Sequence, residues 1–179
     1  MRKEYRLAHR IDPRTHEPGL GVLIGLQLLW AGWAADMRTF GFGKSLPDQQ
    51  DPSEEWALHI QCPWRLESET GIVTGKSDWY EPVDESWDSE AGRLDTSDRL
   101  QDARLKSIFS SSAEPNGPLR NTSDQFAVEA VEIGDNGYFS ITLSGGFRLQ
   151  AFPDGSRGEY WRVFKRGDFG SHHVCGPGS

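Results

Sequence analysis

Residues 54–67 alternate apolar and polar side chains over most of their length. A β-strand places successive side chains on opposite faces, so this alternation predicts a strand with one buried face. Pro63 has no backbone N–H to donate, which predicts that the strand lies at a sheet edge or ends near this residue. The residues expected on the buried face are Trp56, Leu58, Ile60, Cys62, Trp64 and Leu66.

A similar alternation lies 91 residues further along the chain. Residues 126–153 predict a three-stranded meander, with turns at residues 134–137 and 144–146, where glycine supplies the positive φ of tight turns. Residues 23–29 and 38–43 also have strand patterns, with Ala31 and Gly32 in a turn-like stretch between them. The offset aligns three apolar residues of each returning strand: Trp56, Leu58 and Ile60 with Phe147, Leu149 and Ala151.

One helix is expected between the two sets of strands, over residues 93–109. Asp95, Thr96 or Ser97 can cap its start. The residues that share one side of this helix are Leu94, Gln101, Leu105, Ile108 and Phe109.

These patterns predict an α+β domain built from a duplicated antiparallel β-meander, two units of three to four strands, with one helix between them. The first unit is expected within residues 20–80 and the second within residues 126–175, and each range includes a further strand after its meander, at residues 71–74 and 160–164. The chain has 179 residues with seven Trp and nine Phe, enough for one hydrophobic core, so we expect residues 1–179 to form a single domain.

The net charge of −8 is concentrated in the middle of the chain. Residues 48–102 hold fifteen acidic and four basic side chains, whereas residues 1–47 hold four acidic and seven basic ones and residues 103–179 hold eight of each. Such a segment is either a solvated loop or an acidic face that attracts a basic protein partner. Nucleic acid is not an expected partner, because its phosphates would be repelled.

The uncharged segment of residues 19–35 has two interpretations. It predicts a buried pair of strands with a turn, and the alternative is an export signal with Gly32 and Ala34 before the cut. It is too short and glycine-rich for a membrane span, so no membrane association is expected. Two cysteines, Cys62 and Cys175, suggest a reducing, cytoplasmic compartment, and a disulfide between them is the alternative.

The chain carries no recognisable catalytic motif. His59, Gln61 and Arg65 fall on the polar face of the 54–67 run, where His can act as a base and Arg can hold an anion. The other explanation, which we favour, is a solvated or helix-covered sheet face. His172, His173 and Cys175 do not complete a zinc site, because neighbouring side chains of a strand diverge. No metal or other cofactor is expected.

The segment of residues 77–88 mixes three aromatic rings with five carboxylates. Aromatic side chains surrounded by charge are typical of interface hot spots, although rings in loops also pack back onto a core. The residues of this candidate partner-binding segment are Asp78, Trp79, Tyr80, Glu81, Asp84, Glu85, Trp87 and Asp88.

The sequence WALHIQCPWRL at residues 56–66, followed by GGFRLQAFPDGS at residues 145–156, resembles small, uncharacterised bacterial proteins of immunity-protein type over residues 20–175. The resemblance implies a compact intracellular binder and transfers no catalytic residue. We therefore expect a non-enzymatic protein-binding domain, an immunity-type inhibitor or an assembly subunit, that engages a basic partner through the acidic aromatic segment. The alternative is a small-molecule-binding or hydrolytic domain that uses His59, Gln61 and Arg65.

Overall fold

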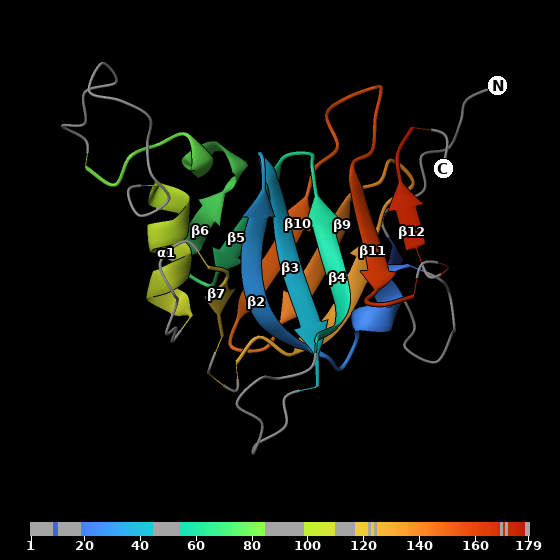
Figure 1. The fold of residues 1–179 in the computed structure, drawn as a ribbon, viewed down its shortest axis with the longest axis horizontal. Helices are drawn as coiled ribbons and strands as arrows, with labels where there is room; N and C mark the ends of the chain where they lie inside the picture. The colour runs from blue at the N-terminus through green and yellow to red at the C-terminus, as the bar shows by residue number, and fades with distance from the viewer. Residues whose placement is uncertain are drawn as a thin grey trace.

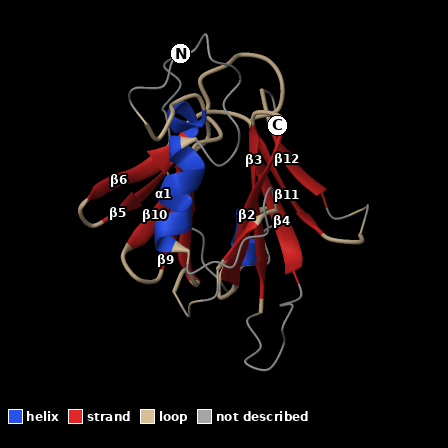
Figure 2. Cartoon of the chain, turned by 60° about the vertical axis from the view of Figure 1, so that its left-hand side comes forward, coloured by secondary structure: helices blue, strands red, loops and turns tan. Residues whose placement is uncertain are grey.

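The computed structural model describes residues 9–10, 19–44, 54–84, 99–109, 117–121, 123, 125–168, 170 and 172–177. These residues form two antiparallel sheets that face each other, with one α-helix at an open side between them (Figures 1 and 2). The coarse expectation of antiparallel sheets accompanied by a helix is confirmed. No described helix is long and apolar enough to cross a membrane.

Each sheet has six strands. Sheet A has the order β1 (His9–Arg10), β8 (Val128–Ile133), β9 (Phe139–Leu143), β10 (Phe147–Ala151), β5 (Trp64–Ser68) and β6 (Gly71–Gly75). Sheet B has the order β12 (His172–Cys175), β11 (Trp161–Lys165), β4 (Glu54–Ile60), β3 (Met37–Gly43), β2 (Gln27–Ala34) and β7 (Leu119–Arg120). The helical elements are η1 (Leu20–Leu23), η2 (Lys76–Trp79) and α1 (Leu100–Ile108).

After each meander, the chain crosses to the opposite sheet. The meander β2–β3–β4 lies in sheet B and continues into the hairpin β5–β6 of sheet A, and the meander β8–β9–β10 lies in sheet A and continues into the hairpin β11–β12 of sheet B. The two crossings are adjacent, because Gln61 N donates to Tyr160 O at 2.9 Å and Phe152 N donates to Pro63 O at 2.8 Å. The 54–67 run is thus two strands rather than one, and the division falls at Pro63.

The first strand pair of each meander contains a register shift, whereas the second pair shifts in β3–β4 but not in β9–β10. The β2–β3 register shifts between Leu28 and Trp30, and the β8–β9 register shifts between Val128 and Ala130. The two meanders meet at a bridge between Gln27 and Ala127. On either side of it, Leu28 N donates to Phe126 O at 3.1 Å and Val128 N donates to Leu26 O at 2.8 Å.

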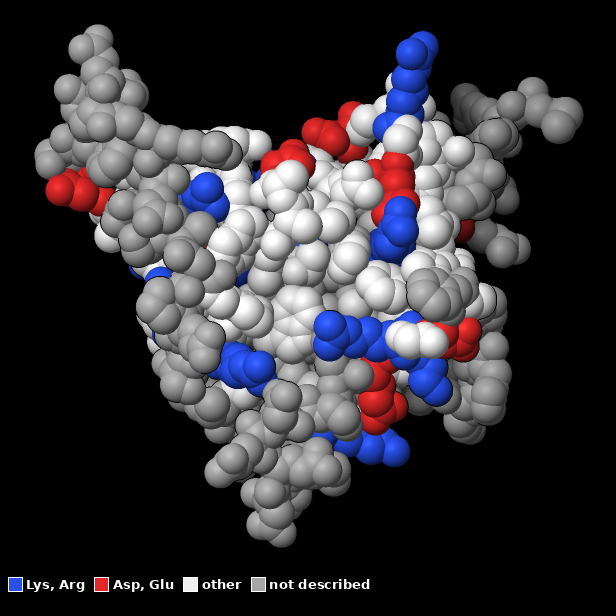
Figure 3. Space-filling view, viewed as in Figure 1, with Lys and Arg blue, Asp and Glu red and all other residues white. Residues whose placement is uncertain are grey.

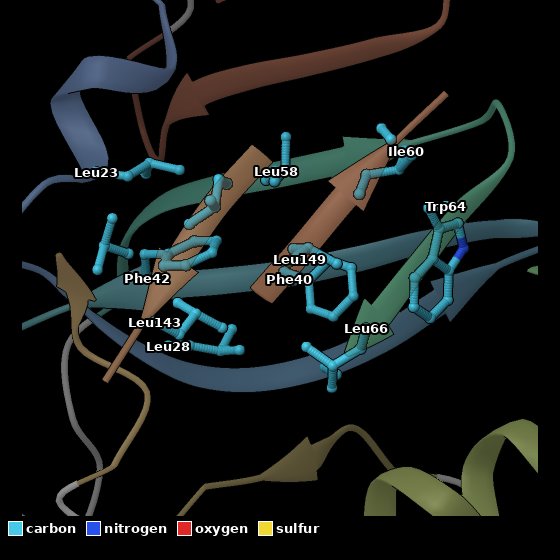
Figure 4. Packing of buried hydrophobic residues seen from close by; sticks show 14 of the residues in the cluster. Leu23, Leu28, Phe40, Phe42, Leu58, Ile60, Trp64, Leu66, Leu143 and Leu149 are labelled. Atoms are coloured by element: carbon cyan, nitrogen blue, oxygen red, sulfur yellow. The ribbon is translucent and has the colours of Figure 1, made fainter. Parts of the chain in front are cut away.

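The hydrophobic core lies between the two sheets (Figure 4). Each large aliphatic side chain buried there contributes about 1.5–3 kcal/mol. Aromatic rings from opposite sheets meet edge to face: Phe40 with Trp64 at 5.6 Å, and Phe139 with Trp161 at 5.5 Å. Five of the six side chains expected on the inner face are buried, and Trp56 is half-buried; the five are Leu58, Ile60, Cys62, Trp64 and Leu66.

The start of the first meander differs from the expectation. Residues 20–23 form the short helix η1, and β2 runs through Ala31 and Gly32, which were expected in a turn. The chain turns instead at Ala35, whose φ is 55°. Glycine serves close approach in this sheet: a Cβ at Gly41 would lie 1.9 Å from Trp30 Nε1, because the indole crosses the outer face at that position.

Helix α1 is shorter than expected, and it begins after Arg99 without a side-chain cap. The candidate capping residues Asp95, Thr96 and Ser97 lie outside the described residues. Cys62 is buried and Cys175 partly buried, and the disulfide between them that the sequence left open is not formed. Burial raises the pKa of the Cys62 thiol to about 11.

Candidate functional site

The candidate partner-binding segment begins where β6 leads into η2, and Asp78 fixes this junction. Thr74 Oγ1 donates a hydrogen bond to Asp78 Oδ2 at 2.7 Å, and Gly75 N donates to the same oxygen at 3.3 Å. Thr74 is fully buried. The carboxylate of Asp78 therefore holds the backbone in place, and a role for it in binding a partner would compete with these bonds.

Trp79 joins three elements of the fold. Its ring lies 6.1 Å from the ring of Trp33 in β2. The guanidinium of Arg99, the residue that precedes α1, lies 3.7 Å from the centroid of the Trp79 ring. A cation over an indole at this distance is favourable. Trp79 is half-buried by these contacts, which makes it a support for the segment that follows.

In the described part of this segment, Tyr80 and Val83 are the exposed apolar residues, with 62% and 50% of their surface accessible. The acidic residues beside them, Glu81 and Asp84, are also exposed. The backbone is tied to the helix, because Leu100 N donates to Glu81 O at 2.8 Å and Pro82 bridges Arg99. These exposed apolar and acidic side chains thus project from a backbone that is anchored at both β6 and α1.

The remaining residues of the candidate segment, Glu85, Trp87 and Asp88, lie outside the described residues. A further exposed apolar side chain, Ile72 at 64%, lies on β6. It borders a hollow of about 310 Å³ between β6 and α1, whose lining includes Arg104, Ser107 and Ile108.

A buried ion pair lies at the start of α1, and sequence reasoning did not identify it. Arg38 Nη1 donates to Asp102 Oδ1 at 2.8 Å and to Gln101 Oε1 at 3.1 Å, and the two charged side chains are 1% and 3% exposed. Gln101 Nε2 in turn donates to Gly75 O at 2.7 Å, which links the helix to β6. Burial lowers the pKa of Arg38, and the carboxylate of Asp102 opposes that effect.

The alternative site residues do not lie together. His59 lies in β4 of sheet B and Arg65 in β5 of sheet A. Gln61 lies between these two strands, where its Nε2 donates to Glu159 Oε1 at 3.0 Å. The Arg65 guanidinium pairs with Glu67 at 2.7 Å, donates to Gln150 at 3.1 Å and lies over Phe152. These contacts occupy Arg65 within its own sheet, on the far side of the molecule's core from His59.

His59 belongs to an aromatic row on sheet B. The Phe164 ring lies edge to face with His59 at 4.8 Å and stacks on His172 at 4.8 Å. Burial lowers the pKa of His59, and the charge of Arg162 lowers it further. Arg162 pairs with Glu159 and depresses the pKa of that carboxyl by hydrogen bonding.

No metal site is formed by the part of the chain that the structure describes: it holds no group of three His, Cys, Asp or Glu side chains placed to bind an ion. His172 stacks on Phe164, while the His173 ring packs 5.8 Å from Trp161. Figure 3 shows the outer face of sheet B as a largely uncharged centre with Lys, Arg, Asp and Glu towards its rim.

Comparisons with protein-family models, with curated proteins and with solved structures found no match.

Proposed function

We propose that this protein is a non-enzymatic binding domain that engages a basic surface of a protein partner. The observation that carries the proposal is the pairing of exposed apolar side chains, Tyr80 and Val83, with the exposed carboxylates Glu81 and Asp84. Large exposed apolar groups beside charge are typical of interaction sites.

The anchored backbone supports the same proposal. Asp78 fixes the junction to β6, the Trp79 ring packs against Trp33 and Arg99, and Glu81 O accepts from the first residue of α1. A segment that is already ordered loses little conformational freedom when a partner binds. Tyr80 and Val83 therefore act as preformed apolar contacts, with Trp79 as their support.

Charge supports a basic partner. Residues 54–84 carry seven Asp and Glu side chains and two Lys and Arg side chains. A surface of this sign speeds the approach of a cationic protein and disfavours anionic competitors. Glu85, Trp87 and Asp88, which lie outside the described residues, are further candidate contacts in this proposal.

The resemblance to immunity-type proteins suggests the specific form of the function. In that form the domain inhibits a basic partner, such as a nuclease toxin, by covering its surface. Service as an assembly subunit is the second form of the same binding function, and the two differ in whether the complex abolishes an activity of the partner.

We also infer that the two halves of the chain arose by duplication. Both meanders hand over to the opposite sheet, both have a register shift in the first strand pair, and Gln27 and Ala127 face each other where the halves meet. Because the acidic segment follows the first half alone, the proposed binding surface is a feature that the second half does not repeat.

The test begins with capture of the partner by the full chain from the cells that produce it, and mass spectrometry identifies that partner. Calorimetry then compares Glu81→Lys/Asp84→Lys with a charge-matched control in β8, Glu129→Lys/Glu132→Lys. The first variant should bind about tenfold or more weakly, while the control changes little. Equal affinities of the two variants would contradict the proposal.

A second pair of variants tests the apolar contacts. Tyr80→Ala should weaken binding by about 1–2 kcal/mol or more, as hot-spot residues do. Val174→Ala removes another exposed apolar side chain, on β12, and serves as the control. Affinity should also fall steeply from low to high salt, because exposed charges are screened.

A further inference from the structure

We propose that the start of α1 forms a binding site for a phosphate-type oxyanion, held between Arg38 and Arg99. The site adjoins the protein-binding segment, because Arg99 lies over the Trp79 ring, but the anion-binding proposal does not depend on that function.

One edge of the Arg38 guanidinium is unused. Nη1 donates to both Asp102 and Gln101, whereas Nε and Nη2 have no hydrogen-bond partner. These two nitrogens point their N–H groups to the same side, and this fork matches two oxygens of one phosphate or carboxylate group. The unused pair of donors therefore has the geometry of an oxyanion site.

The donors on this edge of Arg38 are buried, so leaving them without hydrogen-bond partners is energetically costly. Arg38 is 1% exposed, so water reaches its nitrogens poorly. Buried donors without partners are unfavourable and rare in folded proteins, and each one calls for a specific explanation. An oxygen-rich anion would satisfy both donors at once, after the half-buried side chains of Arg99 and Trp79 move aside to admit it.

Arg99 adds a second cationic group at the start of the helix. Its Nη1 is also buried without a partner, while its guanidinium lies over the Trp79 ring. Arg38 and Arg99 are close enough for the charge of Arg99 to lower the pKa of Arg38. Since Asp102 neutralises one of the two cations, one positive charge remains.

The helix itself favours an anion at this place. Gln101 and Asp102, which touch Arg38, belong to the first turn of α1, and the N-terminus of a helix carries a partial positive charge. Nη1 of Arg38 thus contacts side chains of the helix end that attracts anions.

Asp102 distinguishes between the two classes of oxyanion. Its Oδ2 has no hydrogen-bond partner and needs a donor. A carboxylate ligand offers none, whereas a singly protonated phosphate offers three acceptor oxygens to the arginines and one hydroxyl to Asp102. The mixed set of groups therefore favours phosphate over carboxylate. Arg99 and Trp79 are only half-buried, so the surface lies on their side of the site.

The experiment uses the full chain and inorganic phosphate at constant ionic strength, followed by calorimetry and by the melting temperature. Acetate and chloride are the comparison anions. We expect saturable binding and stabilisation by phosphate, weaker effects of acetate, and none of chloride beyond ionic strength. Equal responses to all three anions, or stronger binding of acetate, would overturn the assignment.

Three variants locate the site. Arg38→Lys keeps a positive charge but removes the fork, and Arg99→Gln removes the second cation; both should weaken phosphate binding roughly tenfold or more. Arg104→Gln changes an exposed arginine on the same helix and should leave binding unchanged. If Arg38→Lys does not fold, two other measurements test the site. One compares the phosphate affinities of Arg99→Gln and Arg104→Gln, and the other follows the NMR signal of Arg38 Nε–H in the unmodified protein as phosphate is added. A signal that phosphate does not shift, or an Arg99→Gln variant that binds as tightly as Arg104→Gln, would refute the site.

Discussion

Removal of one partner of the buried pair Arg38–Asp102 should destabilise the fold severely. Asp102→Leu leaves the guanidinium buried with Gln101 as its remaining partner. Breaking a buried pair in this way costs about 3–5 kcal/mol. For a chain of 179 residues, where each kcal/mol shifts the melting temperature by about 2–4 °C, the expected decrease is about 6–20 °C.

The double variant Arg38→Leu/Asp102→Leu separates the charge from the packing. Replacement of a whole buried pair by apolar side chains is often neutral or stabilising by about 1–4 kcal/mol. We therefore expect the double variant to recover most of the stability lost in Asp102→Leu. Urea unfolding followed by tryptophan fluorescence measures both, and the exposed Arg104→Leu serves as control, with an expected change within about 0.5 kcal/mol.

Two results would refute this reasoning. A loss below about 1 kcal/mol in Asp102→Leu would show that Arg38 reaches water or another acceptor when Asp102 is gone. A double variant that is less stable than Asp102→Leu by about 1 kcal/mol would show that the two side chains act through packing rather than through their charges.

Three further predictions concern other parts of the fold. Gly41→Ala should destabilise by about 1–3 kcal/mol in thermal melts, because its Cβ would meet Trp30 Nε1 at 1.9 Å; an unchanged melting temperature would contradict this contact. Because the pKa of His59 is lowered in the folded protein, the unfolded chain binds the proton more readily, and stability should fall as the pH drops from about 6.5 towards the folded pKa. His59→Gln should flatten the plot of unfolding free energy against pH in this range. A slope identical to that of the unmodified protein would exclude the effect. The Cys62 thiol, with its pKa raised to about 11, should resist iodoacetamide at pH 8 until urea is added, as mass spectrometry of the modified peptide would show; rapid labelling of the folded protein would contradict its burial.

The inner faces of the strands were predictable because alternation is a local property of the backbone. Leu58, Ile60 and Leu66 are buried as their spacing predicts. The crossing between β4 and β5 was not predictable from alternation, because both sheets face the same core and the apolar residues continue from one to the other. Pro63 marked the break but did not reveal that the chain changes sheets there.

Glycine gave a misleading signal in the first meander. Gly32 was expected in a turn, yet it lies within β2, where a Cβ would come within 2.9 Å of the Trp30 ring. The sequence shows that a glycine is present but not whether it serves a turn or close contact across a strand.

The buried ion pair joins residues 64 positions apart, and no periodic pattern connects them. A signal for one partner exists, because Arg38 has the same parity as the buried Phe40 and Phe42 and so is expected to point inwards. The identity of its carboxylate partner required the position of α1. In the candidate segment, sequence predicted a mixture of rings and acids, while the division between the supporting Trp79 and the exposed Tyr80 depends on the distant residues Trp33 and Arg99.

The exchange of hairpins between the sheets makes the two halves of the chain inseparable. A fragment that ends after β6 keeps the meander β2–β3–β4 but lacks β11 beside β4, and its own hairpin β5–β6 lacks β10. Each half thus supplies strands that complete the sheets of the other half. Split at any point between β6 and β8, the molecule should be recovered by mixing its pieces, and neither piece should show cooperative unfolding when it is alone.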